Sequence, residues 1–179
     1  MATVPQDLSV VSRIAIEMQK LLRAREWRAV AHEKVRPINS EAIVIRAYRT
    51  PQKEGEKGYR QEATPGLIIT LPRRIFRPGG ENSEDEVRYQ LLVQIVDENP
   101  DESDGLHTYA KWQQTISRLF SRTDLDQTVF DEDGYVYYGH ATELDVFDDS
   151  LFNRHDLAVC GVMVDFISNE PSLAEQEDS

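Results

Sequence analysis

The feature that most constrains the fold of this 179-residue chain is a regular alternation of apolar and polar side chains between Val87 and Asp97. Successive side chains of a strand point to opposite faces, so the alternation predicts a strand with one buried and one largely polar face. The buried side would carry Val87, Tyr89, Leu91, Val93 and Ile95, and the polar side Arg88, Gln90 and Gln94. Other elements must then cover the apolar side.

Helical spacing of apolar residues occurs in two other segments, and short apolar or alternating runs predict four further strands. Asp7 or Ser9 is the candidate N-cap of the first helix, and Ser103 or Asp104 that of the second. On the first helix, the charged side chains of Arg13, Lys20 and Arg23 are expected on the surface. Residues 72–86 have no period and are predicted to form a turn. The expected elements are a helix at 9–25, strands at 42–49, 67–71 and 87–97, a helix from Leu106 to about Arg122, and strands at 135–147 and 157–167.

This order of elements, with three strands between the two helices and two strands after the second, predicts an α+β fold. We expect a mostly antiparallel sheet of about four to five strands, packed against two helices on one face. Residues 1–168 would form a single domain. The polar stretch from Thr50 to Gly66 predicts a long exposed loop, of the kind that is disordered or used for binding. Residues 169–179 predict an acidic, flexible C-terminal tail.

The hydropathy of the chain predicts a soluble, cytoplasmic product, because no apolar run is long enough to span a bilayer and no secretory leader is recognisable. The charge is divided unevenly. Residues 1–80 contain 15 basic and 8 acidic residues, a net charge of +7, whereas residues 81–179 contain 5 and 24, a net charge of -19. The acidic excess argues against tight binding of DNA or RNA, unless the first half of the chain forms a segregated basic patch. The division indicates either two differently solvated surfaces or a basic surface that meets an acidic one on the next subunit.

No pattern in the sequence predicts an enzyme. The glycine pairs lack the spacing and the following helix of a phosphate-binding loop, and Cys160 falls on an apolar strand face, where an inert core thiol is expected. His140, His155 and several aspartates have the residue types of metal ligands, but a solvated acidic hairpin end is favoured over a divalent cation site. The sequence therefore predicts no catalytic residue, no cofactor and no metal ion.

Two features indicate a contact surface. Arg73, Arg74 and Arg77 form the densest basic cluster, which is interpreted as a solvated turn, a contact with an acidic neighbouring subunit or a contact with phosphate. Trp112 is predicted to lie off the buried stripe of the second helix, and an exposed tryptophan is typical of an interface.

The layout of these segments resembles the tail terminator or tail completion proteins of long-tailed bacteriophages, over about residues 8–168. Those proteins likewise open with an amphipathic helix, run through short strands into a long alternating strand followed directly by a helix, and close on a strand. The matching segments are Val10 to Arg25, PGLIITLP at 65–72, EDEVRYQLLVQIVDEN at 84–99, LHTYAKWQQTISRLF at 106–120 and LAVCGVMVDFI at 157–167.

The resemblance implies a non-enzymatic virion protein, assembled in the host cytoplasm, that forms a ring, as a hexamer, at the head-proximal end of the tail tube. Such a ring would stop polymerisation of the tail, contact the tail tube protein and the head-completion or neck protein, and let DNA pass without specific binding. An acidic lumen would repel DNA phosphates over a Debye length of about 10 Å. Its candidate lining residues are Asp145, Asp148, Asp149 and Asp156. An adaptor or regulatory protein-binding domain and a metal-dependent enzyme remain as alternatives.

Overall fold

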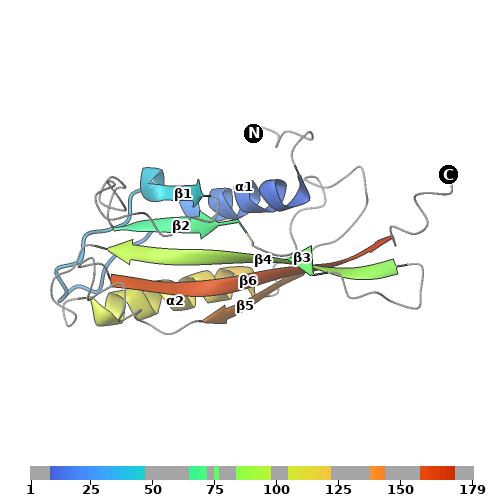
Figure 1. Ribbon diagram of the computed structural model, residues 1–179. Coiled ribbons are helices and arrows are strands. Elements are labelled where there is room, and N and C mark those ends of the chain that lie inside the picture. Colours follow the sequence, from blue (N-terminus) through green and yellow to red (C-terminus); the bar gives the residue numbers. More distant parts are fainter. Residues whose placement is uncertain are drawn as a thin grey trace, which may run out of the picture.

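The computed structural model describes residues 9–46, 65–71, 75–76, 84–97, 105–121, 138–143 and 158–171. These residues form two long helices and one sheet (Figure 1). In chain order the elements are α1 (Val10–Arg23), the short 3-10 helix η1 (Ser40–Ala42), β1 (Ile43–Arg46), β2 (Gly66–Thr70), β3 (Ile75–Phe76), β4 (Glu84–Asp97), α2 (Leu106–Phe120), β5 (Tyr138–Glu143) and β6 (Ala158–Pro171).

The strands form one sheet in the order β1-β2-β4-β6-β5, and the short β3 pairs separately with β4. The β1–β2 pair is parallel, and every other described pair is antiparallel. β4 and β6 pair over fourteen residues each, from Glu84 opposite Pro171 to Asp97 opposite Ala158. The predicted α+β class and mostly antiparallel sheet are confirmed.

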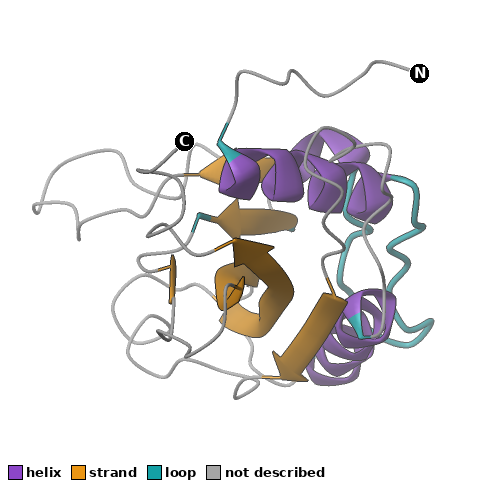
Figure 2. Cartoon of the chain, turned by 90° about the vertical axis from the view of Figure 1, so that its right-hand side faces the viewer, coloured by secondary structure: helices purple, strands orange, loops and turns teal. Residues whose placement is uncertain are grey.

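The register gives the sheet two distinct faces. Residues that are paired across neighbouring strands point to the same side, so the row that contains Leu91 and Val164 belongs to one face and the row that contains Gln90 and Asp165 to the other. The first face, here called the inner face, shares one buried cluster with both helices. α1 lies against the β1 side of the sheet and α2 behind β4, β6 and β5 (Figures 1 and 2).

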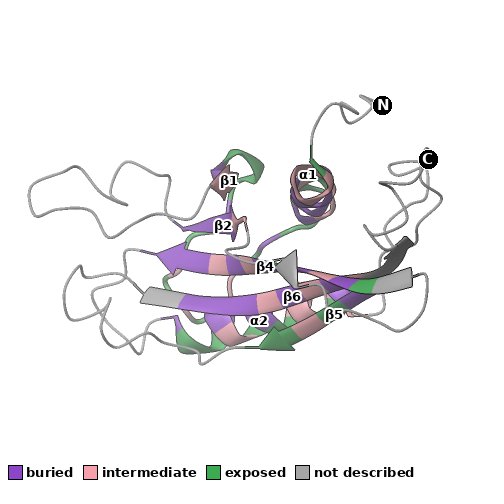
Figure 3. Cartoon of the chain, turned by 45° about the vertical axis from the view of Figure 1, so that its right-hand side comes forward, coloured by how far each residue is buried: buried purple, intermediate pink, exposed green. Residues whose placement is uncertain are grey.

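The core is the apolar layer between the inner face and the helices (Figure 3). The alternating side chains predicted for the long strand are all buried there. Two polar contacts fix α1 on the sheet, because Gln19 Nε2 and Arg23 Nη2 both donate to the carbonyl oxygen of Ile43, at 2.7 and 3.0 Å. The core side chains of the helices are Ile14, Ala15, Met18, Leu22, Tyr109, Trp112, Ile116 and Phe120.

Residues 24–39, here called the connecting segment, lead from α1 to η1 in the chain and contact both α1 and α2 on the way. Trp27 and Ile38 form an isolated β-bridge at its ends, and Trp27 Nε1 donates to the carbonyl oxygen of Leu22 at 2.9 Å. Farther along, Val30 N donates to Thr108 Oγ1 of α2 at 2.9 Å. The sequence shows no pattern here because these contacts are made by backbone groups and single anchoring side chains.

The prediction that Trp112 is exposed is wrong. Only 1% of this residue is accessible, its ring lies 6.0 Å from that of Tyr109, and its Nε1 donates to the carbonyl oxygen of Arg28 at 3.2 Å. The connecting segment covers the flank of α2 on which Trp112 lies, so the buried part of this helix is wider than the stripe that the sequence period identifies. Trp112 therefore belongs to the core of the subunit.

Three further predictions need correction. The 72–86 turn contains β3 and the start of β4, because a long β6 provides paired backbone beyond the apolar alternation. For the same reason the tail does not begin at residue 169, since β6 continues to Pro171. Arg13 was expected on the surface of the first helix but is 7% exposed.

The two helices begin differently. Ser9 is the N-cap of α1, as one of the two predicted alternatives, and its Oγ accepts from Ser12 N at 3.4 Å. The N-cap of α2 is Gly105, so the prediction of Ser103 or Asp104 is wrong. Gly105 has no capping side chain. A distant carboxylate takes this role, as described below.

Candidate functional site

Most of the side chains predicted to act at a site lie outside the described residues. This holds for the basic cluster of Arg73, Arg74 and Arg77 and for His155. It holds equally for the four candidate lumen carboxylates of Asp145, Asp148, Asp149 and Asp156. His140 is described, and it is exposed on β5, at the register position opposite Asp165.

Cys160 lies on the inner face, as its place in the strand pattern predicts. It is 4% exposed, and burial raises the pKa of its thiol to about 12. Deprotonation to the reactive thiolate is therefore strongly disfavoured at neutral pH. This thiol is a packing group in the core.

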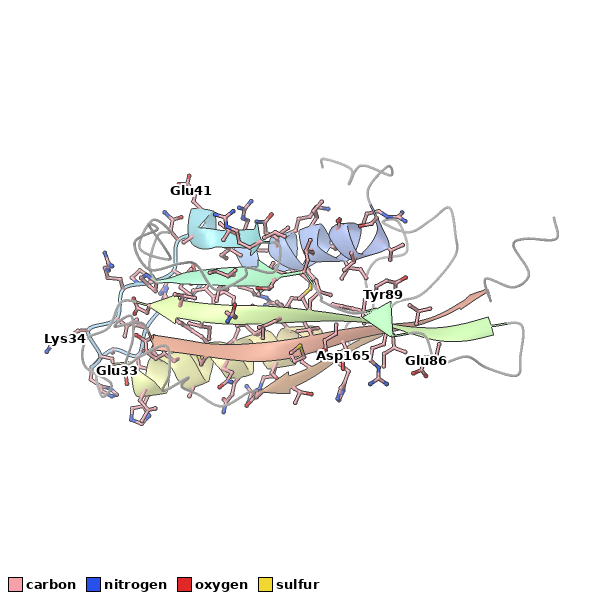
Figure 4. The ribbon with its side chains drawn as sticks, in the orientation of Figure 1. Glu33, Lys34, Glu41, Glu86, Tyr89 and Asp165 are labelled. Carbon is pink, nitrogen blue, oxygen red and sulfur yellow. The ribbon has the colours of Figure 1, made fainter. Side chains whose placement is uncertain are left out.

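The face of the sheet opposite the helices, here called the outer face, is the principal surface that the described strands offer. Figure 4 views this face from the front, with Asp165 labelled on β6. Half-buried apolar side chains, such as Leu92 and Met163, alternate on it with polar ones. Its members with a described side chain are Val44, Arg46, Ile68, Thr70, Glu86, Arg88, Gln90, Leu92, Gln94, Val96, Met163, Asp165, Ile167, His140 and Thr142.

Polar contacts between neighbouring strands and within β4 order part of this face. Gln90 Nε2 donates to Asp165 Oδ1 at 2.9 Å, which joins β4 to β6. Arg88 Nη2 lies 3.5 Å from Glu86 Oε1, while Arg88 Nε is buried and has no hydrogen-bond partner among the described residues. This face therefore mixes half-buried aliphatic groups with ordered polar groups.

The strand order also separates the two differently charged parts of the chain. β1 and β2, from the basic part, form one side of the sheet, and β4, β6 and β5, from the acidic part, form the other. Among the described side chains, the part before residue 80 carries eight basic and four acidic groups, and the part after it three basic and four acidic. Four of those eight basic side chains, Arg25, Arg28, Lys34 and Arg36, lie on the connecting segment, which packs against α2, so the division along the sequence is only partly a division in space.

A second cluster of functional side chains lies where the connecting segment meets the start of α2. Glu33 Oε1 accepts from His107 N at 3.0 Å, and Glu33 Oε2 accepts from Thr108 N at 2.9 Å and from Thr108 Oγ1 at 2.5 Å. This carboxylate caps α2 and places negative charge at the positive end of the helix dipole. Figure 4 shows Glu33 at this end of the molecule and Glu86 toward the opposite end.

These contacts change the acidity of Glu33. Desolvation raises the pKa of its carboxyl group, but the hydrogen bonds from the Thr108 hydroxyl and from the two backbone amides, together with the charge of His107, outweigh it. The pKa of Glu33 therefore lies below the ordinary value of 4.5. The sequence contained no signal for this cap, because Glu33 is about 75 residues away from the helix that it caps.

Comparison with known proteins yields no assignment. No protein-family model matches the chain, and no curated protein sequence matches it. None of the described helices is long and apolar enough to cross a membrane.

Proposed function

We propose that this protein is a structural virion protein of a long-tailed bacteriophage, which forms a ring at the head-proximal end of the tail tube. It would end tail polymerisation and join the tail to the head or neck. The observation that carries the proposal is the unequal charge of the two parts of the chain, +7 for residues 1–80 and -19 for residues 81–179, together with the strand order that places β1 and β2 on one side of the sheet and β4, β6 and β5 on the other.

A subunit with opposite charge on opposite sides suits head-to-tail association. When the basic side of one copy meets the acidic side of the next, the contact repeats in one rotational sense, and it closes into a ring when a whole number of these rotations completes the circle. Electrostatic complementarity of this kind selects the partner and its orientation more than it adds raw affinity. The half-buried aliphatic groups of the outer face, such as Leu92, would contribute apolar area to contacts with neighbouring components.

The net charge of the chain agrees with a channel for DNA. A surplus of carboxylates repels phosphate through the long-range field, so DNA could pass without adhering. Asp145, Asp148, Asp149 and Asp156 stay the candidate lining residues, and the tail tube protein and a head-completion protein are the proposed partners. In this proposal the protein carries out no catalytic reaction and needs no cofactor.

The proposal is tested by measuring the mass of the untagged protein in solution, alone and with tail tubes, by sedimentation. A six-membered ring that weakens with rising salt is expected, because salt screens exposed charges. Reversing Arg73, Arg74 and Arg77 to glutamate should weaken the ring, whereas the same reversal at the exposed Lys20, Arg25 and Lys111 changes the net charge equally and serves as the control. A persistent monomer, even in the presence of tubes, would contradict the ring and favour the adaptor alternative.

Localisation provides the second test. Antibody labelling of purified phage particles should place the protein at the junction of tail and head. Labelling elsewhere on the particle, or absence from particles, would refute the proposed role even if the protein forms rings.

A further inference from the structure

Three side chains with metal-ligating atoms meet at the junction between the connecting segment and α2. They are His32, Glu33 and His107, and one potential ligand atom of each lies within 4.8 Å of the others. The two imidazole rings approach edge to face, with centroids 5.9 Å apart and an interplanar angle of 61°. The sequence contains four histidines, so half of them are at this point, brought together from segments about 75 residues apart.

The hydrogen bonds of Glu33 leave one acceptor position open. Each carboxylate oxygen has two lone pairs. Oε2 uses both, for Thr108 N and Thr108 Oγ1, whereas Oε1 accepts a single described hydrogen bond, from His107 N. Oε1 is therefore the ligand atom that Glu33 can offer, and the three hydrogen bonds hold the carboxylate in place. A ligating carboxylate that is itself hydrogen-bonded is the usual arrangement around protein-bound metals.

The histidine side chains can complete the donor set. Both residues are exposed, and no hydrogen bond of their ring nitrogens is found among the described residues. Zinc binds histidine nitrogen and carboxylate oxygen at about 2.0–2.2 Å, which places neighbouring ligand atoms of a tetrahedral site about 3.4 Å apart. The ligand atoms lie within 4.8 Å of one another, and rotation of the two exposed imidazole side chains can bring them to this shorter spacing.

We propose that His32, Glu33 and His107 form a binding site for a divalent transition-metal ion, with zinc as the ion that best fits two imidazoles and one carboxylate. Water would take the fourth position. The positive end of the α2 dipole opposes a cation here, so the charge of Glu33 is essential to the site. A bound ion would join the connecting segment to the start of α2. The site is independent of ring assembly.

Isothermal titration of the untagged, full-length protein with zinc chloride at neutral pH tests the proposal. One zinc ion per chain is expected, and His32→Asn and His107→Asn should each weaken binding by at least about tenfold, the effect of losing roughly 1.4 kcal/mol of binding free energy. The matched control is the double variant His140→Asn/His155→Asn, which removes the other two histidines and should bind zinc as the unmodified protein does.

Zinc K-edge absorption on the unmodified protein gives a readout that needs no variant, and it should report two imidazole nitrogens among ligands that are otherwise oxygen. Absence of saturable binding would overturn the proposal. So would binding that survives both His32→Asn and His107→Asn, or that is lost in the His140→Asn/His155→Asn control.

Discussion

Replacement of Gly105 by alanine should destabilise the fold through a steric conflict with Tyr109. A Cβ atom at position 105 would lie 2.4 Å from Tyr109 Cε2, 2.5 Å from Cζ and 2.7 Å from the hydroxyl oxygen. Real Cβ atoms do not approach other atoms so closely, so the ring or the helix start must move. The backbone of Gly105 has φ of -143°, which any residue adopts, so the cost is one of packing.

The size of the expected loss of stability depends on the contacts that hold the Tyr109 ring in place. The residue is 1% exposed, and its hydroxyl donates to Asp97 Oδ2 at 2.7 Å, where Asp97 is itself only 5% exposed. Overpacking of a core costs about 1–3 kcal/mol. Loss of a hydrogen bond to a charged group costs about 1.5–3 kcal/mol. Because the ring cannot move without straining that hydrogen bond, we expect Gly105→Ala to lower the free energy of unfolding by about 3 kcal/mol.

Urea unfolding followed by far-ultraviolet circular dichroism measures this change. Leu106→Ala is the matched control, because Leu106 is 41% exposed and surface changes typically alter stability by less than about 0.5 kcal/mol. In the double variant Gly105→Ala/Tyr109→Leu the smaller side chain relieves the conflict, so the combined cost should be less than the sum of the single costs. Strict additivity, or a cost of Gly105→Ala no larger than the control, would refute the steric explanation.

Three shorter predictions concern single residues. Glu33→Gln should lower stability at neutral pH by about 0.5–2 kcal/mol, the range for loss of a helix cap. Because the pKa of Glu33 is lowered on folding, its ionised form contributes fully above about pH 4.5 and the contribution is lost as the pH falls below that, so urea midpoints of the two proteins should converge in acid. Cys160 should resist iodoacetamide in the native protein and react after unfolding, as followed by mass spectrometry; rapid native alkylation would contradict its burial. Trp112→Ala should lower the unfolding free energy by about 3–5 kcal/mol, whereas an interface role would leave monomer stability unchanged.

The predictions that succeeded depend on local periodicity. The alternation in Val87–Asp97 and the three-and-four spacing in the helices identify the inner face and the core side of α1, because each pattern directly reflects which side of an element is buried. Element order then sufficed for the fold class. The parallel pairing of β1 with β2 was not predicted, since nothing in either short strand records the direction of its neighbour.

The predictions that failed involve contacts between distant segments. Trp112 is buried by the connecting segment, and α2 is capped by Glu33, a residue of that same segment. Neither relation has a signature in the residues next to the helix. The cluster of His32, Glu33 and His107 has no sequence signature for the same reason, because its members come from segments about 75 residues apart.

The connecting segment also completes the cover of the inner face of the sheet. The inner face needs cover along its full width, yet α1 packs against β1 and α2 packs against β5 and β6. Trp27 and Ile38, both part of the core cluster, anchor the connecting segment between the two helices and complete the apolar layer there. Because all of this apolar cover lies on one side, the outer face is left to be defined by its own polar and aliphatic side chains.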